Sequence, residues 1–195
     1  LFLHIISKRD DGYHNLQTIF QLLDYCDELN FDIRNDGKIN RTQGNENIPL
    51  EKDLIIQSAL KLKQLAPSNY GVDVGVIKKI PSGGGLGGGS SNAATTLIAL
   101  NKLWDINLPK TKLIELGKEL GADVPVFIDG RSSWAEGTGE ILSPLSLPRY
   151  FYLVVSIKKQ ISTQEIFRHK ALTMSALQRK MSDFSLVSNP HNDCL

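Results

Sequence analysis

The glycine-rich stretch at residues 81–91, "PSGGGLGGGSS", constrains the fold more than any other part of the chain. Six of the 16 glycines fall within residues 83–89, interrupted only by Leu86. Glycine loses more backbone entropy on folding than any other residue, so such a concentration needs a local reason. A strand pattern over residues 72–80, with valines at alternate positions, precedes the stretch, and a helical pattern over residues 92–104 follows it. A strand, a glycine loop and a helix in this order predict a cradle for a phosphate group at the helix N-terminus.

Three other interpretations of this stretch are weaker. In a flexible surface turn, Ser90 and Ser91 would only cap the following helix, but flexible linkers seldom join a buried strand directly to an amphipathic helix. No Gly-Lys-Ser/Thr follows the glycines, so the stretch is not a Walker loop. Gly83, Gly85 and Gly88 fit the dinucleotide pattern G-x-G-x-x-G, but another helical segment follows where that fold needs a strand ending in an acid. A nicotinamide-binding oxidoreductase is therefore disfavoured.

The rest of the chain mixes strand and helix patterns, which indicates an α/β or α+β fold. A polar hairpin or loop is expected over residues 35–50, and Gly121 stands where a left-handed helix cap is common. The prolines at 144 and 148 mark a boundary. Strands are expected at residues 1–6, one or two within 18–34, and at 72–80, 124–128, 132–137 and 150–157. Helices are expected at residues 53–65, 92–104, 112–120, 164–171 and 175–181.

Composition and charge exclude several classes of protein. Hydrophobic residues make up 41% and the net charge is +1, so nothing points to a nucleic-acid partner. No apolar run reaches membrane-spanning length, and the opening "LFLHII" lacks the basic leader of a signal peptide. Cys26 and Cys194 form neither a disulfide framework nor a metal spacing, which fits a cytoplasmic protein. We interpret the short basic pairs as solvated surface charge; they are Lys8-Arg9, Lys78-Lys79 and Lys158-Lys159.

The stretch "PSGGGLGGGSSNAA" resembles the ATP-binding loop of the GHMP kinase superfamily, whose pattern is P-x-x-x-G-L-G-S-S-A-A. Its expanded form is similar to that of the 4-diphosphocytidyl-2-C-methyl-D-erythritol kinase family. The segments "LFLHI", "RDDGYHNLQTIFQLLDY", "GADVPVFIDG" and "WAEGTGEIL" agree with this family, and "ISTQEIF" and "NDC" agree more loosely. The resemblance therefore covers almost the whole chain.

The resemblance implies an α+β, two-domain GHMP kinase fold. A ribosomal protein S5 domain 2-like, ATP-binding N-terminal domain is expected over residues 1–147, and the beginning of a ferredoxin-like C-terminal domain over 148–195. The family has a catalytic lysine just before the stretch that matches "LFLHI", and a later glycine motif beyond "NDC". We therefore expect a chain truncated at both ends and, as written, poorly active.

The implied activity is ATP-dependent phosphorylation of the 2-hydroxyl of 4-diphosphocytidyl-2-C-methyl-D-erythritol, in the non-mevalonate route to isoprenoid precursors. ATP and Mg²⁺ are the implied cofactors, and the partner is a small-molecule substrate rather than a nucleic acid or a membrane. No pattern indicates a metal ligand or an oligomeric state. The implied ATP-binding residues are Pro81, Gly83, Gly84, Gly85, Leu86, Gly87, Gly88, Gly89, Ser90 and Ser91.

Four further residues gain roles only from the resemblance. Asp123 alone is more simply a turn aspartate that bonds its own backbone, but the family's matching residue is the catalytic base. Tyr13 and His14 alone suggest an aromatic packed over a turn and a surface histidine. In the family the tyrosine stacks on cytosine, the histidine bonds its edge, and Phe167 matches the aromatic on the other side of the base. Asp53 stands where an asparagine of the nucleotide pocket is expected, so it is not counted as a site residue.

Two other functions remain open at this point. Another GHMP kinase could act on a smaller alcohol, such as homoserine or mevalonate, although Tyr13, His14 and "GADVPVFIDG" argue against it. The absence of the family's lysine gives some weight to a non-catalytic nucleotide-binding module. An assay with ATP and a panel of alcohols separates these functions.

Overall fold

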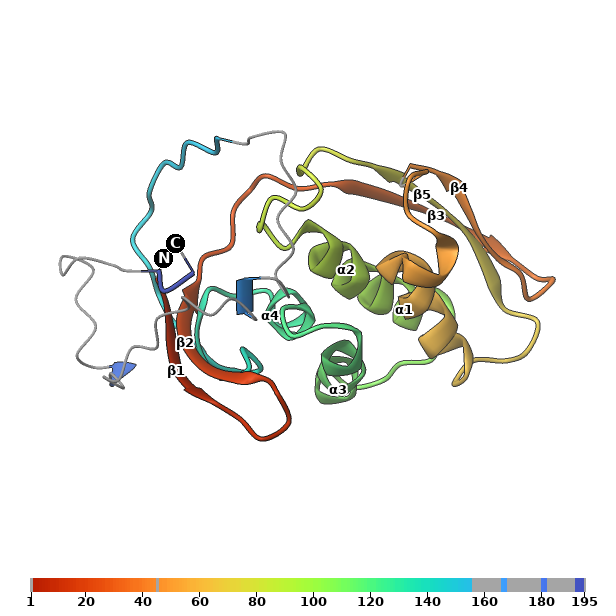
Figure 1. Cartoon of the computed structure of the whole chain (residues 1–195). Helices are drawn as coiled ribbons and strands as arrows, with labels where there is room; N and C mark the ends of the chain where they lie inside the picture. Colours follow the sequence, from red (N-terminus) through yellow and green to blue (C-terminus); the bar gives the residue numbers. More distant parts are fainter. Residues whose placement is uncertain (1, 45, 156–165, 168–179, 182–191, 195) are drawn as a thin grey trace. The chain divides into compact units, whose positions relative to one another are not determined.

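The structure is a computed structural model that describes residues 2–44, 46–155, 166–167, 180–181 and 192–194 (Figure 1). The chain divides into two compact units. Unit 1 comprises Leu1–Leu22 and Gly130–Leu195, and unit 2 comprises Leu23–Asp129. Unit 2 is continuous in sequence, whereas unit 1 draws on both ends of the chain.

Unit 2 contains a three-stranded sheet in the order β3-β5-β4. The strands are β3 (Glu28–Arg34), β4 (Ile39–Gln43) and β5 (Gly71–Ile77). The central strand β5 pairs antiparallel with β3 and parallel with β4. Its alternate residues Val72 and Val74 are buried, as period-two alternation predicts for a strand with one face on a core.

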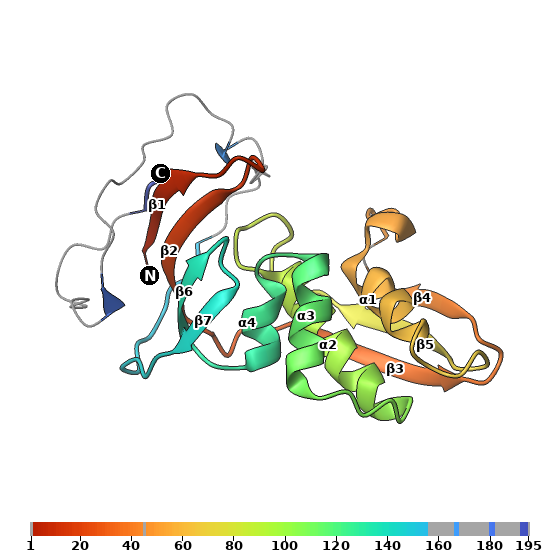
Figure 2. The same cartoon turned by 90° about the horizontal axis from the view of Figure 1, so that it is seen from below.

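Four helices complete unit 2, and α1 and α2 lie along one face of the sheet (Figures 1 and 2). The elements are α1 (Leu54–Lys63), α2 (Gly88–Leu103), α3 (Lys110–Leu120) and α4 (Val124–Asp129), with a 3₁₀ turn η1 (Leu50–Lys52) before α1. Each long helix places its apolar stripe in one continuous core. The largest fully buried side chain there is Trp104, whose Nε1 donates to the Gly71 carbonyl at 3.3 Å. Other members of this core are Ile55, Leu62, Val72, Val74, Leu97, Leu100 and Val124.

Unit 1 contains an antiparallel sheet of four strands in the order β1-β2-β6-β7. The strands are β1 (Leu3–Lys8), β2 (His14–Phe20), β6 (Ser133–Gly137) and β7 (Ile141–Pro144). β2 meets β6 in a register that places Leu16 opposite Gly137, so the sheet joins segments far apart in sequence. Phe2, Ile19 and Trp134 form its small core.

The "NDC" segment attaches to the free edge of β1. Asn192 forms a parallel bridge with Leu3, and the Asp193 backbone N–H donates to the Leu3 carbonyl at 2.9 Å. The Asp193 carboxylate accepts the Ile5 backbone N–H at 2.8 Å. Residues near the two ends of the chain therefore share one sheet.

The mixed α+β fold and most of the expected elements are confirmed, and the region 18–34 holds parts of two strands. One prediction is wrong in kind, because residues 124–128 form helix α4 instead of a strand. Gly121 ends α3 but is extended, with φ 171°, and not left-handed. The loop expected over 35–50 contains β4, and residues 151–155 have no regular structure. The helices expected at 164–171 and 175–181 lie mostly outside the described residues.

Within the part of the chain that the structure describes, no helix is both long enough and apolar enough to cross a membrane.

Candidate functional site

The glycine loop connects β5 to α2 and has a backbone that only glycine adopts easily. Gly83, Gly85 and Gly87 have φ of +73°, +68° and +66°, each in the left-handed region. Residues 82–85 are exposed. The loop thus presents main-chain groups to solvent without side chains in front of them, which is the property that an anion-binding loop needs.

Helix α2 begins without a side-chain cap. Gly87 is its N-cap residue, and Gly88 and Gly89 begin its first turn. The expected helix start at residue 92 is therefore four residues too late, and Ser90 and Ser91 lie inside the helix, so neither is the N-cap. The first-turn N–H groups and the positive end of the helix dipole remain available to a ligand.

Close packing also requires glycine at the end of the loop. A Cβ atom at Gly87 would lie 2.9 Å from the Phe127 ring. A Cβ atom at Gly88 would lie 3.0 Å from the Ile80 side chain and 3.4 Å from the Lys78 Nζ. The loop is therefore held between the segment that follows β5 and helix α4.

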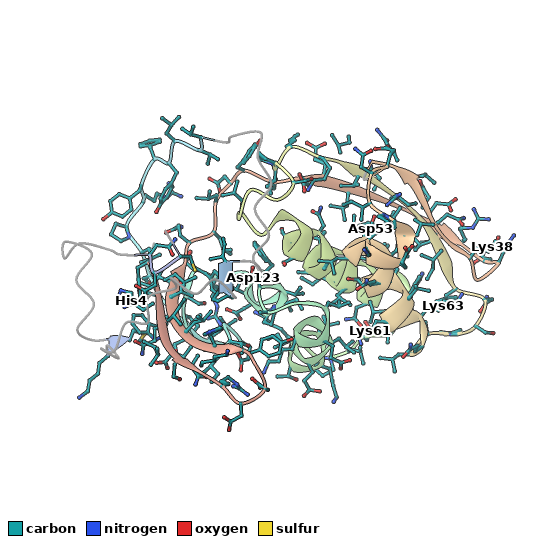
Figure 3. The ribbon with its side chains drawn as sticks, viewed as in Figure 1. His4, Lys38, Asp53, Lys61, Lys63 and Asp123 are labelled. Carbon is teal, nitrogen blue, oxygen red and sulfur yellow. The ribbon has the colours of Figure 1, made fainter. Side chains whose placement is uncertain are left out.

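Asp123 is half-buried immediately before α4 (Figure 3). Its segment lies beside the start of α2, since a Cβ atom at Gly121 would lie 3.9 Å from the Ser90 Oγ and α4 supplies Phe127 against Gly87. Among the described residues, none donates a hydrogen bond to its carboxylate, so the turn aspartate that bonds its own backbone is not what the structure contains. Burial raises the pKa of Asp123 above its ordinary value of 3.8. A carboxylate of this kind is a stronger base than an exposed one.

We predict that Asp123→Asn makes the protein more stable at pH 7. Burial penalises the ionised carboxylate, so the penalty is present above the folded-state pKa and disappears below it. The melting temperature should rise by a few degrees at pH 7, with the gain vanishing in acid. Asp36→Asn is the control, because hydrogen bonds from Arg34 lower the pKa of Asp36 and its loss should destabilise instead. If Asp123→Asn and the parent have equal melting temperatures both at pH 7 and in acid, burial does not penalise the ionised Asp123 carboxylate.

Asp53 has a structural role. It is the N-cap of α1, and its side chain accepts the Ile55 backbone N–H at 2.9 Å. It also accepts from the Arg41 Nη1 at 2.8 Å, and both side chains are largely buried.

The three predicted substrate residues all belong to unit 1. Tyr13 follows the turn between β1 and β2 and is 64% exposed. His14 begins β2, and its ring stacks on Phe167 with centroids 5.4 Å apart and planes 29° apart. Burial, with a smaller effect of Lys8, lowers the pKa of His14 below 6.5. The ring is therefore neutral at pH 7, with one nitrogen that donates and one that accepts.

The sequence interpretation missed Asp27 and misassigned Lys78. The Lys78 ammonium does not stand in solvent: it pairs with the fully buried Asp27 carboxylate beside the glycine loop. Lys79 is 47% exposed, and its ammonium pairs with the exposed Glu28. The only sequence signals for the buried pair are an aspartate just before one strand, β3, and a lysine just after another, β5.

The chain matches known proteins in sequence along its full length. Residues 53–131 match the family described as GHMP kinases N terminal domain. The 4-diphosphocytidyl-2-C-methyl-D-erythritol kinase of Ruthia magnifica subsp. Calyptogena magnifica is 59% identical over 195 residues, which is 100% of this chain and 68% of that protein. The chain belongs to the 4-diphosphocytidyl-2-C-methyl-D-erythritol kinase family.

Solved structures agree with this family. A crystal structure of 4-(cytidine 5'-diphospho)-2C-methyl-D-erythritol kinase matches with a TM-score of 0.73 and 34% identity, over 88% of this chain and 60% of that one. A homoserine kinase from Cytophaga hutchinsonii matches with a TM-score of 0.54 and 18% identity, over 77% of this chain and 56% of that one, which shows a common fold alone. The resemblance read from the motifs of the 4-diphosphocytidyl-2-C-methyl-D-erythritol kinase family is thereby confirmed.

Proposed function

We propose that this chain belongs to an enzyme that transfers the γ-phosphoryl group of ATP to the 2-hydroxyl of 4-diphosphocytidyl-2-C-methyl-D-erythritol. The observation that carries the proposal is the loop of three left-handed glycines that runs into α2, whose start has no side-chain cap. Residues 81–91 hold the triphosphate, with backbone N–H groups and the Ser90 and Ser91 hydroxyls as donors. The related kinases support the assignment of the alcohol.

Asp123 is the general base in this proposal. Its carboxylate takes the proton of the substrate hydroxyl, while the hydroxyl oxygen bonds to the γ-phosphorus and the bond to the bridging oxygen of ADP breaks. The triphosphate adds negative charge near the carboxylate, which raises its pKa further. The proton ends on Asp123, and ADP leaves with the displaced bridging oxygen.

The glycine positions fit a triphosphate, because the left-handed glycines and the uncapped start of α2 leave backbone N–H groups without side chains in front of them. Mg²⁺ when bound with ATP neutralises phosphate charge. The described residues contain no cluster of three His, Cys, Asp or Glu side chains able to hold a metal. Mg²⁺ often binds through substrate phosphates with few protein ligands. The Ser90 or Ser91 hydroxyl would then supply a protein oxygen to the metal. The proposed site of action is the cytoplasm.

Tyr13, His14 and Phe167 recognise the cytosine in this proposal. An aromatic face stacks on any base, whereas the neutral His14 ring provides one donor and one acceptor for a base edge. We also propose a domain boundary between residues 147 and 148.

A phosphorylation assay on the chain extended to the full length of its relatives tests this function. ATP is offered with the cytidylated alcohol, uncytidylated methylerythritol phosphate, homoserine and mevalonate. Strong preference for the cytidylated alcohol is expected. Equal turnover of an uncytidylated alcohol would favour another GHMP kinase, and ATP binding without any turnover would favour a nucleotide-binding module.

Loss of the exposed aromatic ring should weaken substrate binding. Tyr13→Ala should cost roughly 1–3 kcal/mol of affinity for the cytidylated alcohol, the usual value of aromatic–base stacking. Tyr13→Phe keeps the ring face and should bind like the parent. Calorimetric titration with the alcohol compares the three proteins. If Tyr13→Ala binds as tightly as Tyr13→Phe, the ring does not stack on the base.

A further inference from the structure

The buried Asp27 carboxylate collects hydrogen bonds from both ends of the glycine loop. Its Oδ1 accepts the backbone N–H groups of Lys79 and Ile80 at 2.7 and 2.8 Å, just before the loop begins. Its Oδ2 accepts the Asn92 Nδ2 at 2.9 Å, from the early part of α2, and also the Lys78 Nζ. The Asp27 side chain is fully buried, so these four donors take the place of water around the charge.

This arrangement joins the two ends of the loop through one side chain. The segment Lys78–Ile80 leads into the loop and Asn92 follows it, while Ile80 lies against Gly88. The loop between them is rich in glycine and costs conformational entropy to order. When the ends of the loop are already fixed, less conformational entropy is lost as a ligand binds and orders the loop.

Asp27 also sets where a positive charge stands. Lys78 reaches back from the end of β5, and its Nζ lies next to Gly88, the first residue of α2. The pair with Asp27 keeps the ammonium at this position. Burial alone would raise the pKa of Asp27, but the hydrogen bonds from Lys78, Ile80, Lys79 and Asn92 outweigh burial and lower it. The carboxylate is therefore ionised at neutral pH.

We propose that Asp27 is a positioning residue for the phosphate loop: it preorganises residues 81–87 for the triphosphate through Lys79, Ile80 and Asn92, without touching the nucleotide. The proposal rests on the proposed ATP-binding role of the loop. A buried anion near the loop also repels phosphate. Replacing Asp27 should therefore weaken ATP binding if preorganisation dominates and strengthen it if repulsion dominates. We infer that preorganisation dominates, because the Lys78 ammonium neutralises the carboxylate and three uncharged donors hydrogen-bond to it.

The test measures the affinity of Asp27→Ala and Asp27→Asn for adenosine 5'-(β,γ-imido)triphosphate by calorimetry. We expect affinity to fall by roughly tenfold or more for Asp27→Ala. Asp27→Asn keeps an oxygen for the Lys79 and Ile80 N–H groups, so its loss should be smaller. Amide exchange followed by NMR should show Lys79 and Ile80 losing protection in Asp27→Ala and keeping part of it in Asp27→Asn.

Asp73→Asn is the matched control, because Asp73 is an ion-paired carboxylate of the same sheet, bound to Arg34 at 2.6 Å and Asn40 at 2.8 Å. It should lower stability but leave the affinity within about twofold. In the full-length kinase, the Asp27 variants should raise the KM for ATP and leave the KM for the alcohol unchanged. Unchanged or tighter analogue binding by both Asp27 variants overturns the proposal while ATP binding by the loop stands. If the parent and Asp73→Asn also fail to bind the analogue, both proposals fall together.

Discussion

Replacing Asp123 by asparagine should lower kcat by roughly 10²–10⁴-fold, the usual contribution of a positioned acid or base. The asparagine keeps the shape of the side chain and loses only the ability to accept the proton. Affinity for ATP should stay similar or improve, because a like charge beside the phosphates is removed. Single-turnover phosphoryl transfer, in the chain extended to the length of its relatives, measures the chemical step directly.

The pH dependence provides an independent check on Asp123. Burial raises its pKa, so activity should fall on the acid side at a higher pH than the ordinary value of 3.8 predicts. Asp105→Asn is the control: Asp105 is exposed, and asparagine tolerates its left-handed φ of 54°. A loss below about tenfold in Asp123→Asn, with chemistry rate-limiting, would make Asp123 a positioning residue and not the base.

Gly87→Val should weaken ATP binding by roughly 10²-fold or more, the second large effect that the structure predicts. The valine would stand in a left-handed backbone with its Cβ 2.9 Å from the Phe127 ring. The loop would have to change its path, which would displace the backbone N–H groups proposed to bind the phosphates. Calorimetry with ATP measures the effect, and Gly88→Val, which presses on Ile80, should act in the same direction.

Gly130→Val separates the loop effect from general backbone strain. Gly130 also has a positive φ, +72°, but a Cβ there meets nothing within 4 Å and the residue lies outside the loop. This variant should lose stability and keep its ATP affinity. If Gly87→Val and Gly88→Val both bind ATP like the parent, residues 81–91 are not the phosphate cradle.

Local sequence patterns predicted the long helices and the strands with clear apolar alternation. They were wrong for α4, where Val124, Val126 and Ile128 resemble a strand because branched side chains favour β structure. The segment is short and these three side chains are buried, so packing overrides the local preference. β4 was missed because "INRTQ" is mostly polar. The segment is a strand because it pairs with β5, and that pairing cannot be read from the local sequence.

The residues of the candidate site also differ in how far the sequence predicts them. The glycine loop is contiguous in sequence, and the phosphate-binding role proposed for it rests on residue type and order alone. Asp123 needed the resemblance, since an isolated turn aspartate has no distinguishing pattern. Asp27 was missed altogether, because its partners Lys78 and Asn92 lie far along the chain and meet it only after β3 pairs with β5.

The division of the chain into units also fixes an order of events during synthesis on the ribosome. Unit 2 is one uninterrupted segment, Leu23–Asp129, so all of it emerges from the ribosome before β6 does, and most of it can begin to fold before then. β2 precedes that segment, and its partner β6 follows it, with Leu16 opposite Gly137. At common elongation rates the wait is roughly 10 s, during which one edge of β2 has no strand to pair with. Sequence changes that slow the folding of unit 2 should therefore prolong the exposure of β2, which unit 2 does not contain. The yield of soluble protein should fall as a result.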